Sequence, residues 1–259
     1  MNSGIFKRVC TSIANSLLDF SVGLIMASHP EWTPRAWSNR EIRKLGYLFT
    51  GHVLNVSAIK DGDKEGGVYR DYFPNARSYT ITNYGKEIGS SGSINEKELD
   101  ISIPYDGSIG QYDVVLAHTV LEHVYPFTTS ILNLCALSED VIVIVSPFIQ
   151  GMHGKNGFYY DYFRFTPLAL EKILEEQGFQ TIYYNWNEDH PLLNVYIIQV
   201  ATRFPQKYRN KLPPSRGLKL GINSPGLVYS KMLWPSIGGR KMSFLRRLGN
   251  WIGHSIKER

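Results

Sequence analysis

Two apolar segments constrain the fold of this chain more than any other feature. YDVVLA (residues 112–117) and DVIVIV (residues 140–145) are almost entirely aliphatic, which is typical of strands that are covered on both faces. The segment between them, residues 126–137, has the length and composition of one helix. A strand, a helix and a strand in this order predict an α/β fold with a mostly parallel sheet.

The same pattern continues on both sides of this unit. Helices are expected over residues 5–26 and 35–49, and a short helix is expected to end near Tyr72. A well-marked helix is expected over residues 166–177, because Thr166 can cap it, Pro167 suits its first turn and Gly178 can end it. Further strands are expected over residues 52–57, 78–82, 99–103, 179–184 and 193–201, and the last two form a closing antiparallel pair.

These elements predict a Rossmann-like, doubly wound sheet with N-terminal helices and a basic C-terminal helical tail. We place the helical extension at residues 1–50, the α/β domain at 51–202 and the tail at 203–259. In such sheets, ligands bind at the carboxyl ends of the strands, near the switch in strand order. Those ends are expected at Ser57, Asn83, Asp100, His118 and Ser146.

Charge divides the chain into two parts. Residues 203–259 contain thirteen Lys and Arg and one acid, whereas residues 1–202 contain fifteen bases and twenty-two acids. In residues 243–258, six apolar side chains fall within about 140° of a helical wheel and basic residues take the other side. This pattern favours a helix that lies on an anionic membrane; the alternative is an ordinary helix docked on the core. Nucleic acid is not expected as a partner, because the body has no broad basic face.

Other bulk features narrow the class of protein. No run of eighteen uncharged apolar residues is present, so we expect no membrane span. Lys7 and Arg8 precede apolar residues as in a signal peptide, but Asp19 interrupts the run, and we interpret residues 5–26 as a helix of the mature protein. The two cysteines, Cys10 and Cys135, form no CxxC pair, so neither a metal site nor a disulfide framework is expected, and a reducing, cytoplasmic compartment fits.

Several motifs after the central strands carry a resemblance. YDVVLAHTVLEHV, then SPF, then His153, then DYFRFTP and a helix ending in GF resemble the class I S-adenosylmethionine-dependent methyltransferases. The LEH and DYxRFT motifs are most similar to the branch found in surface-polysaccharide gene clusters, and the resemblance covers residues 50–200. It implies S-adenosylmethionine as cofactor and a hydroxyl of a glycan or lipid-linked glycan as acceptor.

The cofactor half departs from the family pattern. The segment VLNVSAIKDGDKEGG (residues 53–67) carries Asn55, Ser57 and Ile59 where the family has an acid and glycines, and Asn83 stands where it has the acid that holds the ribose. Backbone amides of residues 58–62 and a helix beginning near Glu65 could still bind the cofactor. The implied cofactor contacts are Asn55, Ser57, Ala58, Gly62, Asn83, Asp100 and His118. Alternatively, the asparagines serve only as turn residues at strand ends.

The acceptor half carries the groups expected for proton transfer. The implied catalytic residues are Glu122, His123, His153, Asp161 and Arg164. A histidine near a carboxylate can act as the general base on a hydroxyl, and Glu122 shares a face with His118 if their segment is helical. Alternatively, His123 caps a helix and Asp161 with Arg164 only fixes a loop. Aromatic residues crowd positions 158–165 and suit a sugar ring, although a helix–sheet core explains about half of them.

Two functions remain open from the sequence. The first is a methyltransferase that acts on a glycan hydroxyl in surface-polysaccharide synthesis, in the cytoplasm or on the inner face of the cell membrane. The second is a non-catalytic or repurposed protein of the same fold that serves as a partner in polysaccharide assembly. The altered cofactor loop favours the second function, and the His/Glu/Asp/Arg set favours the first.

Overall fold

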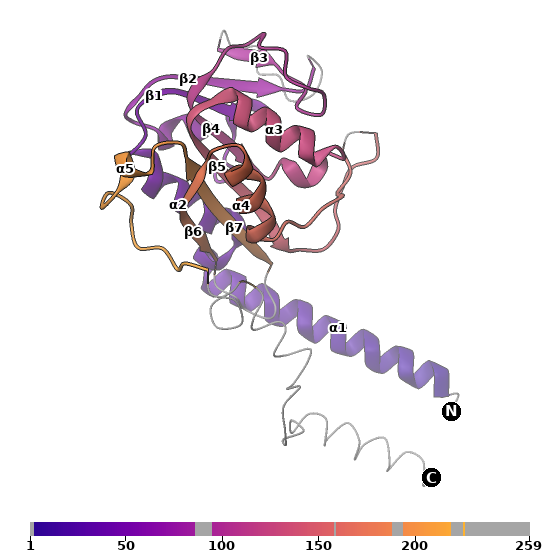
Figure 1. Cartoon of the computed structure of the whole chain (residues 1–259). Helices are drawn as coiled ribbons and strands as arrows, with labels where there is room; N and C mark the ends of the chain where they lie inside the picture. The colour runs from indigo at the N-terminus through magenta and orange to yellow at the C-terminus, as the bar shows by residue number, and fades with distance from the viewer. Residues whose placement is uncertain (1–2, 86–94, 158, 188–193, 219–224, 226–259) are drawn as a thin grey trace.

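One sheet organises the protein. The computed structural model describes residues 3–85, 95–157, 159–187, 194–218 and 225. Within them, seven strands follow the order β3-β2-β1-β4-β5-β7-β6 (Figure 1). Their bounds are β1 Gly51–Val56, β2 Ala76–Asn83, β3 Glu96–Glu98, β4 Tyr112–His118, β5 Ser138–Ile149, β6 Gln180–Trp186 and β7 Val195–Thr202. The predicted mixed α/β fold with a mostly parallel sheet is confirmed.

Strand directions agree with the prediction. The pairs β1–β2, β1–β4, β2–β3 and β4–β5 are parallel, and β7 runs antiparallel to both β5 and β6. The predicted third strand over residues 99–103 is wrong, because β3 ends at Glu98 and a turn follows it. Asp100 Oδ1 accepts a hydrogen bond of 2.7 Å from the Ser102 amide, and this side-chain turn replaces a sheet ladder at that point.

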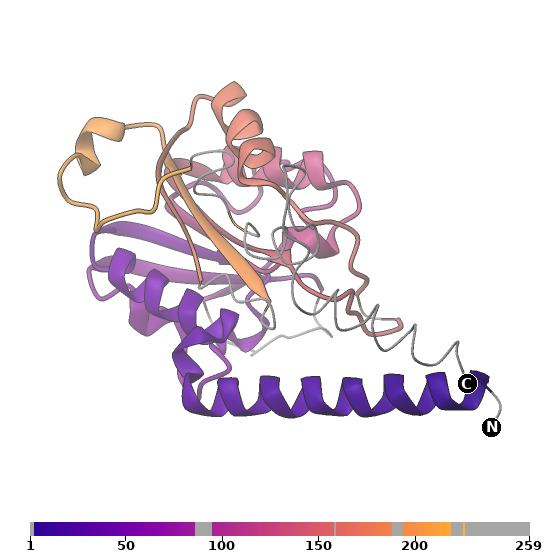
Figure 2. The same ribbon diagram turned by 90° about the horizontal axis from the view of Figure 1, so that it is seen from below.

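Helices cover both faces of the sheet (Figures 1 and 2). On one face, α3 (Phe127–Leu137) and α4 (Pro167–Glu176) pack on strand residues such as Leu54, Val115 and Ile142. On the other face, α2 (Pro34–Gly46) packs on residues such as Val53, and α5 (Pro205–Tyr208) places Tyr208 in the same core. Thr166 caps α4 as predicted, since its hydroxyl accepts from the Ala169 amide.

Helix α2 begins the part of the chain that builds the core. Trp37, Ile42 and Leu45 are buried in it, and the Glu41 carboxylate accepts hydrogen bonds from Tyr183 Oη (2.5 Å) and Asn185 Nδ2 (3.0 Å) on β6. Gly46 allows close packing here, because a Cβ at this position would lie 2.0 Å from the Tyr72 carbonyl oxygen. The helix therefore holds a fixed position relative to the sheet.

The connection from β1 to β2 contains no α-helix. Only the 3₁₀ turns η2 (Ile59–Asp61) and η3 (Tyr69–Tyr72) interrupt it. The short helix predicted to end near Tyr72 is confirmed as η3, whereas the helix predicted to begin near Glu65 is wrong. Two carboxylates in this loop bind the amides that would start such a helix, as described below. Because β1 lies between β2 and β4, the switch in strand order falls at β1 and β4, and ligands are expected at their carboxyl ends.

Helix α1 (Ser3–Ser28) stands apart from the sheet. It packs against the 3₁₀ turn η1 (Pro30–Trp32) and extends away from the body (Figures 1 and 2). By length and composition alone, Arg8–Ser28 could cross a membrane, with a mean hydropathy of 1.5 and none of it buried. The stricter criterion of eighteen uncharged residues excludes it because of Asp19. The helix predicted over residues 243–258 lies outside the described residues.

Candidate active site

The loop after β1 has an unusual backbone. Five of its residues other than glycine have positive φ angles: Ser57 (55°), Ile59 (38°), Lys60 (60°), Asp61 (60°) and Lys64 (64°). Residues other than Gly, Asn and Asp rarely adopt positive φ angles. Surrounding interactions must therefore hold the loop in place.

The amides of this loop bind the protein itself. The Ser57 amide donates to Thr82 Oγ1 (3.2 Å) and the Ala58 amide to the Thr82 carbonyl (2.9 Å). The Ile59 amide donates to Asn83 Oδ1 at 2.9 Å. These donors, expected to face a cofactor, instead join the loop to the end of β2. Gly62, also expected at the cofactor, forms an isolated antiparallel bridge with Val68.

Two buried carboxylates complete the loop. Asp61 accepts hydrogen bonds from Asn55 Nδ2 (2.9 Å), Tyr79 Oη (2.8 Å) and the Arg70 amide (2.9 Å). Asn55 is therefore committed to the loop and is 2% exposed. The only signal for this arrangement in the sequence is the Asp-Gly-Asp spacing of residues 61–63.

Asp63 forms the second set of contacts and is fully buried. Its carboxylate accepts from the amides of Glu65 (2.7 Å) and Gly67 (2.8 Å) and from Tyr72 Oη (2.6 Å). Burial opposes ionisation, but these hydrogen bonds prevail and lower the pKa of Asp63 below its usual value. The amides of residues 65 and 67 are thus turned inward, which explains why no helix begins at Glu65.

Asn83 and Asp100 lie on the neighbouring strand ends. Asn83 is buried; its Oδ1 accepts from Ile59 and its Nδ2 donates to Glu96 Oε1 at 2.6 Å. Both ends of this amide are used within the protein, in the position where the resemblance implied a ribose contact. Asp100 uses Oδ1 for the Ser102 amide, and its side chain is half-buried at the same edge.

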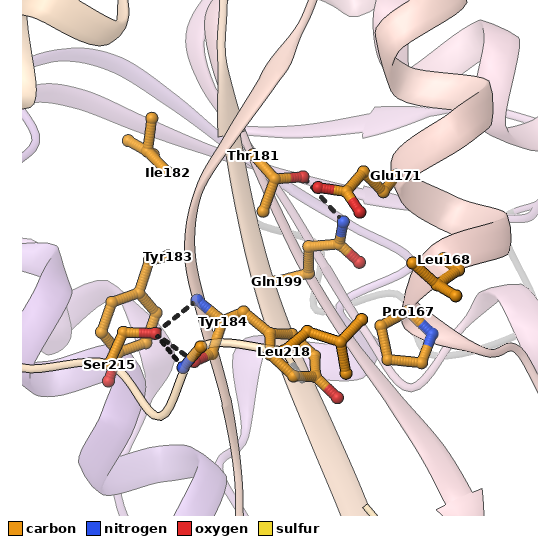
Figure 3. A pocket seen from close by; sticks show the side chains of 11 residues that line it. Pro167, Leu168, Glu171, Thr181, Ile182, Tyr183, Tyr184, Gln199, Ser215 and Leu218 are labelled. Atoms are coloured by element: carbon orange, nitrogen blue, oxygen red, sulfur yellow. Dashed lines mark hydrogen bonds between the residues drawn. The ribbon is translucent and has the colours of Figure 1, made fainter. Parts of the chain in front are cut away.

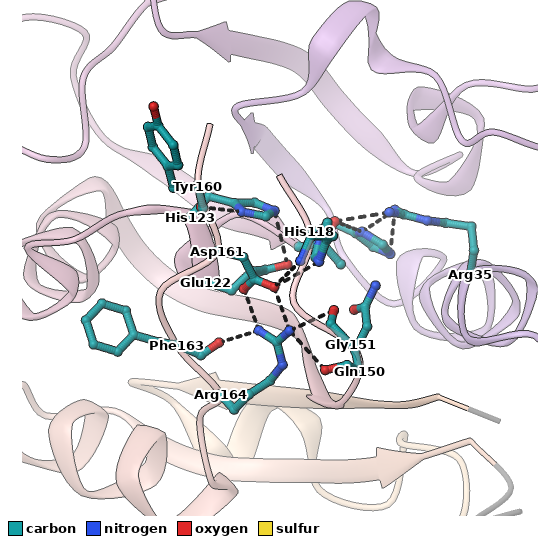
Figure 4. A network of polar contacts seen from close by, with 12 residues as sticks. Arg35, His118, Glu122, His123, Gln150, Gly151, Tyr160, Asp161, Phe163 and Arg164 are labelled. Carbon is teal, nitrogen blue, oxygen red and sulfur yellow. Dashed lines mark hydrogen bonds and ion pairs between the residues drawn. The ribbon is translucent and has the colours of Figure 1, made fainter. Parts of the chain in front are cut away.

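Arg35 joins the site from helix α2, and sequence reasoning missed it (Figure 4). Its Nη1 donates to His118 Nδ1 at 2.6 Å, and its Nη2 donates to Thr119 Oγ1 at 3.1 Å. Nη1 also donates to Tyr69 Oη at 3.1 Å. An arginine one residue after the start of a helix has no distinctive sequence signal, because only the packing of α2 brings it to the carboxyl end of β4.

His118 is neutral in this arrangement. Burial, and then the charge of Arg35, lower its pKa well below the ordinary value. Nδ1 accepts from Arg35, so the hydrogen lies on Nε2, which is 2.9 Å from Ser38 Oγ. His118 ends β4 and Thr119 has a φ of 53°, so the segment through Glu122 is not one helix, and the helical spacing considered for His118 and Glu122 does not apply.

Two cations lie together at this edge. Among the described residues, neither Arg35 nor Lys64 forms an ion pair with a carboxylate at 4.0 Å or less. Burial, and then the charge of Arg35, lower the pKa of Lys64. Arg35 donates hydrogen bonds to the neutral groups of Tyr69, His118 and Thr119, while the carboxylates of Asp61 and Asp63 also act on the Tyr69 hydroxyl. The guanidinium and the ammonium at this edge can bind a carboxylate group of a ligand, in a neighbourhood that holds charges of both signs.

Glu122 is a buried carboxyl group within η4 (Leu121–His123). It is 1% exposed, and neither of its carboxyl oxygens has a hydrogen-bond partner in the described part of the chain. Burial, together with the charge of the nearby Asp161, raises its pKa to about 8. At neutral pH this side chain is a protonated acid that can donate a hydrogen bond.

The remaining predicted residues form one connected group (Figure 4). Asp161 binds Arg164 through two hydrogen bonds of 2.5 and 2.6 Å, and it accepts a third of 3.0 Å from the His153 amide. His153 Nδ1 lies 2.9 Å from Asp161 Oδ2 as an ion-pair contact that lacks hydrogen-bond alignment. The rings of His153 and His123 meet edge to face with centroids 5.0 Å apart. The structure brings all five predicted catalytic residues together.

His123 has a defined tautomer. Its Nδ1 lies 2.9 Å from the Tyr160 carbonyl, which can only accept, so Nδ1 carries the hydrogen and Nε2 keeps its lone pair. Burial lowers the pKa of His123 and keeps the ring neutral. His123 does not cap an α-helix, since α3 begins four residues later at Phe127. Nε2 of this neutral imidazole lies 3.7 Å from Glu122 Oε1 and can accept a proton.

A separate pocket of about 300 Å³ lies between α4, strands β6 and β7 and residues 215–218 (Figure 3). Gln199 Nε2 donates to Thr181 Oγ1 at 2.8 Å within it. None of the residues around His118 or Asp161 lines this pocket. In the described part of the chain, no three His, Cys, Asp or Glu side chains are grouped so that they could hold a metal ion.

No protein-family model and no curated protein matches the sequence. Three solved structures illustrate what the fold is similar to. The Burkholderia thailandensis 1,6-didemethyltoxoflavin-N1-methyltransferase is 16% identical, with a TM-score of 0.46 over 74% of this chain and 89% of that one. The Bradyrhizobium japonicum N-methyltransferase NodS is 10% identical, with a TM-score of 0.46 over 66% and 88%.

The third is the magnesium protoporphyrin IX methyltransferase of Synechocystis, which is 13% identical with a TM-score of 0.42 over 73% of this chain and 78% of that chain. These structures contain bound S-adenosylhomocysteine, S-adenosylhomocysteine and S-adenosylmethionine, respectively. At this level of similarity, the assignment of the fold rests on the strand order of the chain itself.

Proposed function

We propose that this protein is an S-adenosylmethionine-dependent methyltransferase whose acceptor is a hydroxyl of a glycan or lipid-linked glycan. One observation supports it above the others. At the switch in strand order, the guanidinium of Arg35 lies next to a group of proton-transfer residues centred on His123 and Asp161 (Figure 4). A methyl transfer requires both parts, one for the cofactor and one for the acceptor.

The two cations at the edge fit one group of the cofactor, its carboxylate, but the residues do not offer the glycine-loop mode of the family. Arg35 and Lys64 would hold the methionyl carboxylate of S-adenosylmethionine, and Asp100 would accept from the adenine amine, as the resemblance implies. The amides of residues 57–59 and the side chains of Asn55 and Asn83 instead support the loop. When bound, S-adenosylmethionine supplies an electrophilic methyl group on a sulfonium.

His123 is the proposed general base. Its Nδ1 is held by the Tyr160 carbonyl, so Nε2 can take the proton of an acceptor hydroxyl. His123 and His153 are both partly open to solvent, at 18% and 36% of their side chains, whereas Asp161 is 1% exposed. Asp161 positions His153 through its backbone amide and binds Arg164 on its other side. Glu122 is buried and protonated, and its Oε1 lies 3.7 Å from His123 Nε2, so it adjoins the proposed base.

Exposed aromatic side chains favour a sugar as the acceptor. Tyr125 is 71% exposed, Tyr160 is 52%, Tyr162 is 46% and Tyr159 is 41%. The Tyr159 ring meets the His123 ring at a centroid distance of 4.7 Å. Tyrosines combine a flat apolar face with a polar tip, and such faces suit the apolar side of a pyranose ring. The glycan class and a place in surface-polysaccharide synthesis also follow from the resemblance of the LEH and DYxRFT motifs.

A second function is supported by the loop after β1. Its polar groups are satisfied by Asp61, Asp63 and Asn83, so it needs no ligand to hold its shape. A non-catalytic or repurposed protein of the same fold, acting as a partner in polysaccharide assembly, would have this property. Contact of residues 243–258 with an anionic membrane, at the inner face of the cell membrane, is part of either proposal and rests on their sequence pattern.

Calorimetry with S-adenosylmethionine separates the two functions. The methyltransferase should bind it, and Asp100→Ala should weaken binding by about 1–3 kcal/mol through the loss of one buried hydrogen-bond partner. Asp106→Ala is the matched control, because Asp106 is an exposed acid six residues further along. Absence of heat at millimolar ligand would favour the non-catalytic function. If both variants lost the same affinity for S-adenosylmethionine, Asp100 would not be the adenine contact.

A further inference from the structure

Helix α1 exposes more apolar surface than a soluble domain usually does. Nine large apolar side chains on it are between 40% and 64% exposed, and they are Ile5, Phe6, Val9, Ile13, Leu17, Leu18, Phe20, Leu24 and Met26. None of the Arg8–Ser28 segment is buried against the body. In water, such a helix would be a site of aggregation, so another phase or another molecule must cover it.

The distribution of these side chains distinguishes lipid from a protein partner. At 100° per residue, most of the large apolar positions from Ile5 to Leu24 fall within about 120°. The polar residues Arg8, Ser12, Asn15 and Asp19 form a second stripe, centred about 110° from the centre of the apolar one. Towards the body, Leu18 and Met26 lie outside the apolar stripe, so the helix becomes apolar over most of its circumference.

A second copy of the chain would cover only part of this surface. A two-stranded coiled coil buries a narrow seam and uses charged neighbours of that seam to fix its register. With a seam through Ile13, Leu17 and Leu24, the flanking residues are Ala14, Ser16, Ser21 and Gly23, none of which is charged. Ile5, at the edge of the apolar stripe, would stay in water, whereas a lipid interface covers the whole width of the stripe.

The length of the helix would also allow it to cross a membrane. Arg8–Ser28 contains 21 residues, which corresponds to about 31 Å at 1.5 Å per residue, close to the thickness of the hydrocarbon core. Asp19 would be costly at the centre of that core, but in a helix that lies along the interface it would face the headgroups together with Asn15 and Ser12. The polar side therefore favours the interfacial orientation.

We propose that α1 inserts its apolar side into a lipid bilayer, lies in the membrane interface and anchors the protein there. This anchor is distinct from the basic segment at residues 243–258, because insertion of α1 depends on buried apolar area and not on the charge of the lipid. The proposal holds whether or not the protein transfers methyl groups.

Helix α1 is close in the chain to the candidate site. Residues 29–34 alone separate α1 from Arg35, which contacts His118. In both overall views, α1 extends away from the body on the side to which the loop after β5 projects (Figures 1 and 2). The loops that follow the five parallel strands β1 to β5 each expose at least one large apolar residue, among them Ile59, Tyr84, Ile103, Tyr125 and Met152.

This placement specifies the acceptor further, a step that rests on the proposed function. A site held at the membrane surface by α1 would meet acceptors that are themselves anchored in the bilayer. The lipid-linked form of the glycan is therefore the substrate class that fits, rather than a free sugar. Methyl transfer to a lipid-linked acceptor in vesicles should then exceed transfer to the soluble glycan, and the α1 variant below should lose this difference.

Flotation with vesicles of neutral phosphatidylcholine tests the anchor on the full chain. The wild type should float with these vesicles, and about 1 M salt should not release it, since screening to a Debye length of about 3 Å acts only on charge. Leu17→Glu/Phe20→Glu should bind about 100-fold more weakly or worse, because each side chain contributes about tenfold or more. Both residues are exposed, so the fold of the body should not change.

Ser12→Glu/Asn15→Glu is the matched control. It adds the same two charges on the polar side of α1, at exposed positions, and it should bind nearly as tightly as the wild type. Equal loss in both double variants, or release of the wild type by salt, would overturn the proposal. A dimer that persists with vesicles present and does not float would identify a second copy as the occupant. An intact mass that lacks residues 1–28 would identify a cleaved signal, and resistance to alkaline extraction a spanning helix.

A label on Cys10 gives an independent measurement. Cys10 is exposed on α1, whereas the other cysteine of the chain, Cys135, is buried and burial raises its pKa to about 12. A maleimide dye that is sensitive to polarity should therefore react selectively at Cys10. Its emission should shift to shorter wavelength on addition of vesicles and should be quenched by lipids brominated on their acyl chains. Emission that does not change would contradict insertion.

Discussion

The guanidinium of Arg35 lies 2.6 Å from Nδ1 of His118 and thereby joins the N-terminal helix α2 to the carboxyl end of β4. A short chain of hydrogen bonds closes this contact, since His118 Nε2 lies 2.9 Å from Ser38 Oγ and the Ser38 hydroxyl donates to the Arg35 carbonyl at 2.9 Å. The imidazole stays neutral because it is buried beside a cation. The positive charge of the site is thus carried by a segment that precedes the sheet in the sequence.

Arg35→Met should weaken binding of S-adenosylmethionine by about tenfold or more, because a hydrogen bond to a charged group contributes about 1.5–3 kcal/mol. Methionine keeps much of the side-chain volume and removes the charge. Arg77→Met is the control, since Arg77 is an exposed arginine on β2 and the variant has the same net charge. Calorimetry on the two variants measures the difference. If both variants bound S-adenosylmethionine with equal affinity, Arg35 would not contact the cofactor.

His123→Ala should lower turnover by about 10²–10⁴-fold if His123 is the general base, and affinity for S-adenosylmethionine should stay nearly constant. His153→Ala should lower turnover too, because Asp161 holds the His153 amide and the His153 ring packs edge to face against that of His123. His52→Ala is the control, as His52 is exposed at the beginning of β1. Methyl transfer and ligand binding are measured on the same preparations. Normal turnover in both active-site variants would refute the assignment.

Glu122 should make the protein less stable as pH rises. Burial raises its folded-state pKa to about 8, whereas the unfolded chain ionises near the ordinary glutamate value. Between these values the folded state holds one more proton than the unfolded state. The free energy of unfolding should therefore fall by up to about 1.4 kcal/mol per pH unit until pH exceeds about 8.

Glu122→Gln should lack this slope, so its stability relative to the wild type should increase from about pH 5 to about pH 8. Chemical denaturation across this range measures the difference. Glu139→Gln, at an exposed position on β5, should instead follow the wild type at every pH. If the curve for Glu122→Gln also ran parallel to the wild type, Glu122 would be ionised in the folded protein.

Asn83→Asp should destabilise the protein by about 1–3 kcal/mol. From the sequence alone, this change restores the family acid and should tighten cofactor binding. In the structure, Asn83 Nδ2 donates to Glu96 Oε1 at 2.6 Å, so an aspartate would place two carboxylates in contact and remove the donor. Adding Glu96→Gln should recover part of the loss, because an amide again faces a carboxylate. If the single variant were stable and bound the cofactor more tightly, position 83 would be the ribose contact after all.

Deletion of residues 240–259 should leave the body folded, because the described strands end at Thr202. It should also reduce binding to anionic vesicles, since each basic residue near such a surface contributes about 1 kcal/mol. Binding to neutral vesicles through α1 should remain. Co-sedimentation, with a melting curve for the full-length and the truncated protein, measures both effects. A truncated protein that melts lower or aggregates would indicate a helix docked on the core.

The sequence by itself determined the order and type of most elements. The aliphatic runs of β4 and β5, the cap at Thr166 and the stop at Gly178 are local signals, and each acts within a few residues of the structure it specifies. The grouping of Glu122, His123, His153, Asp161 and Arg164 was also accessible, because parallel strands place their carboxyl ends at one edge. The predicted domain boundaries at residues 50 and 202 and the tail helix stay predictions.

Only the tertiary structure decided the nature of the cofactor edge. Asp61 reaches Tyr79 on β2, 18 positions along the chain, Asp63 reaches Tyr72 in η3, and Asn83 uses both ends of its amide within the protein. Such contacts depend on where separate strands and loops meet. Arg35 contacts His118 across 83 positions of the sequence. The apolar side chains of α1 are exposed because no other described segment packs on them. Local sequence carries no signal for either, because each is a property of how distant segments are arranged in space.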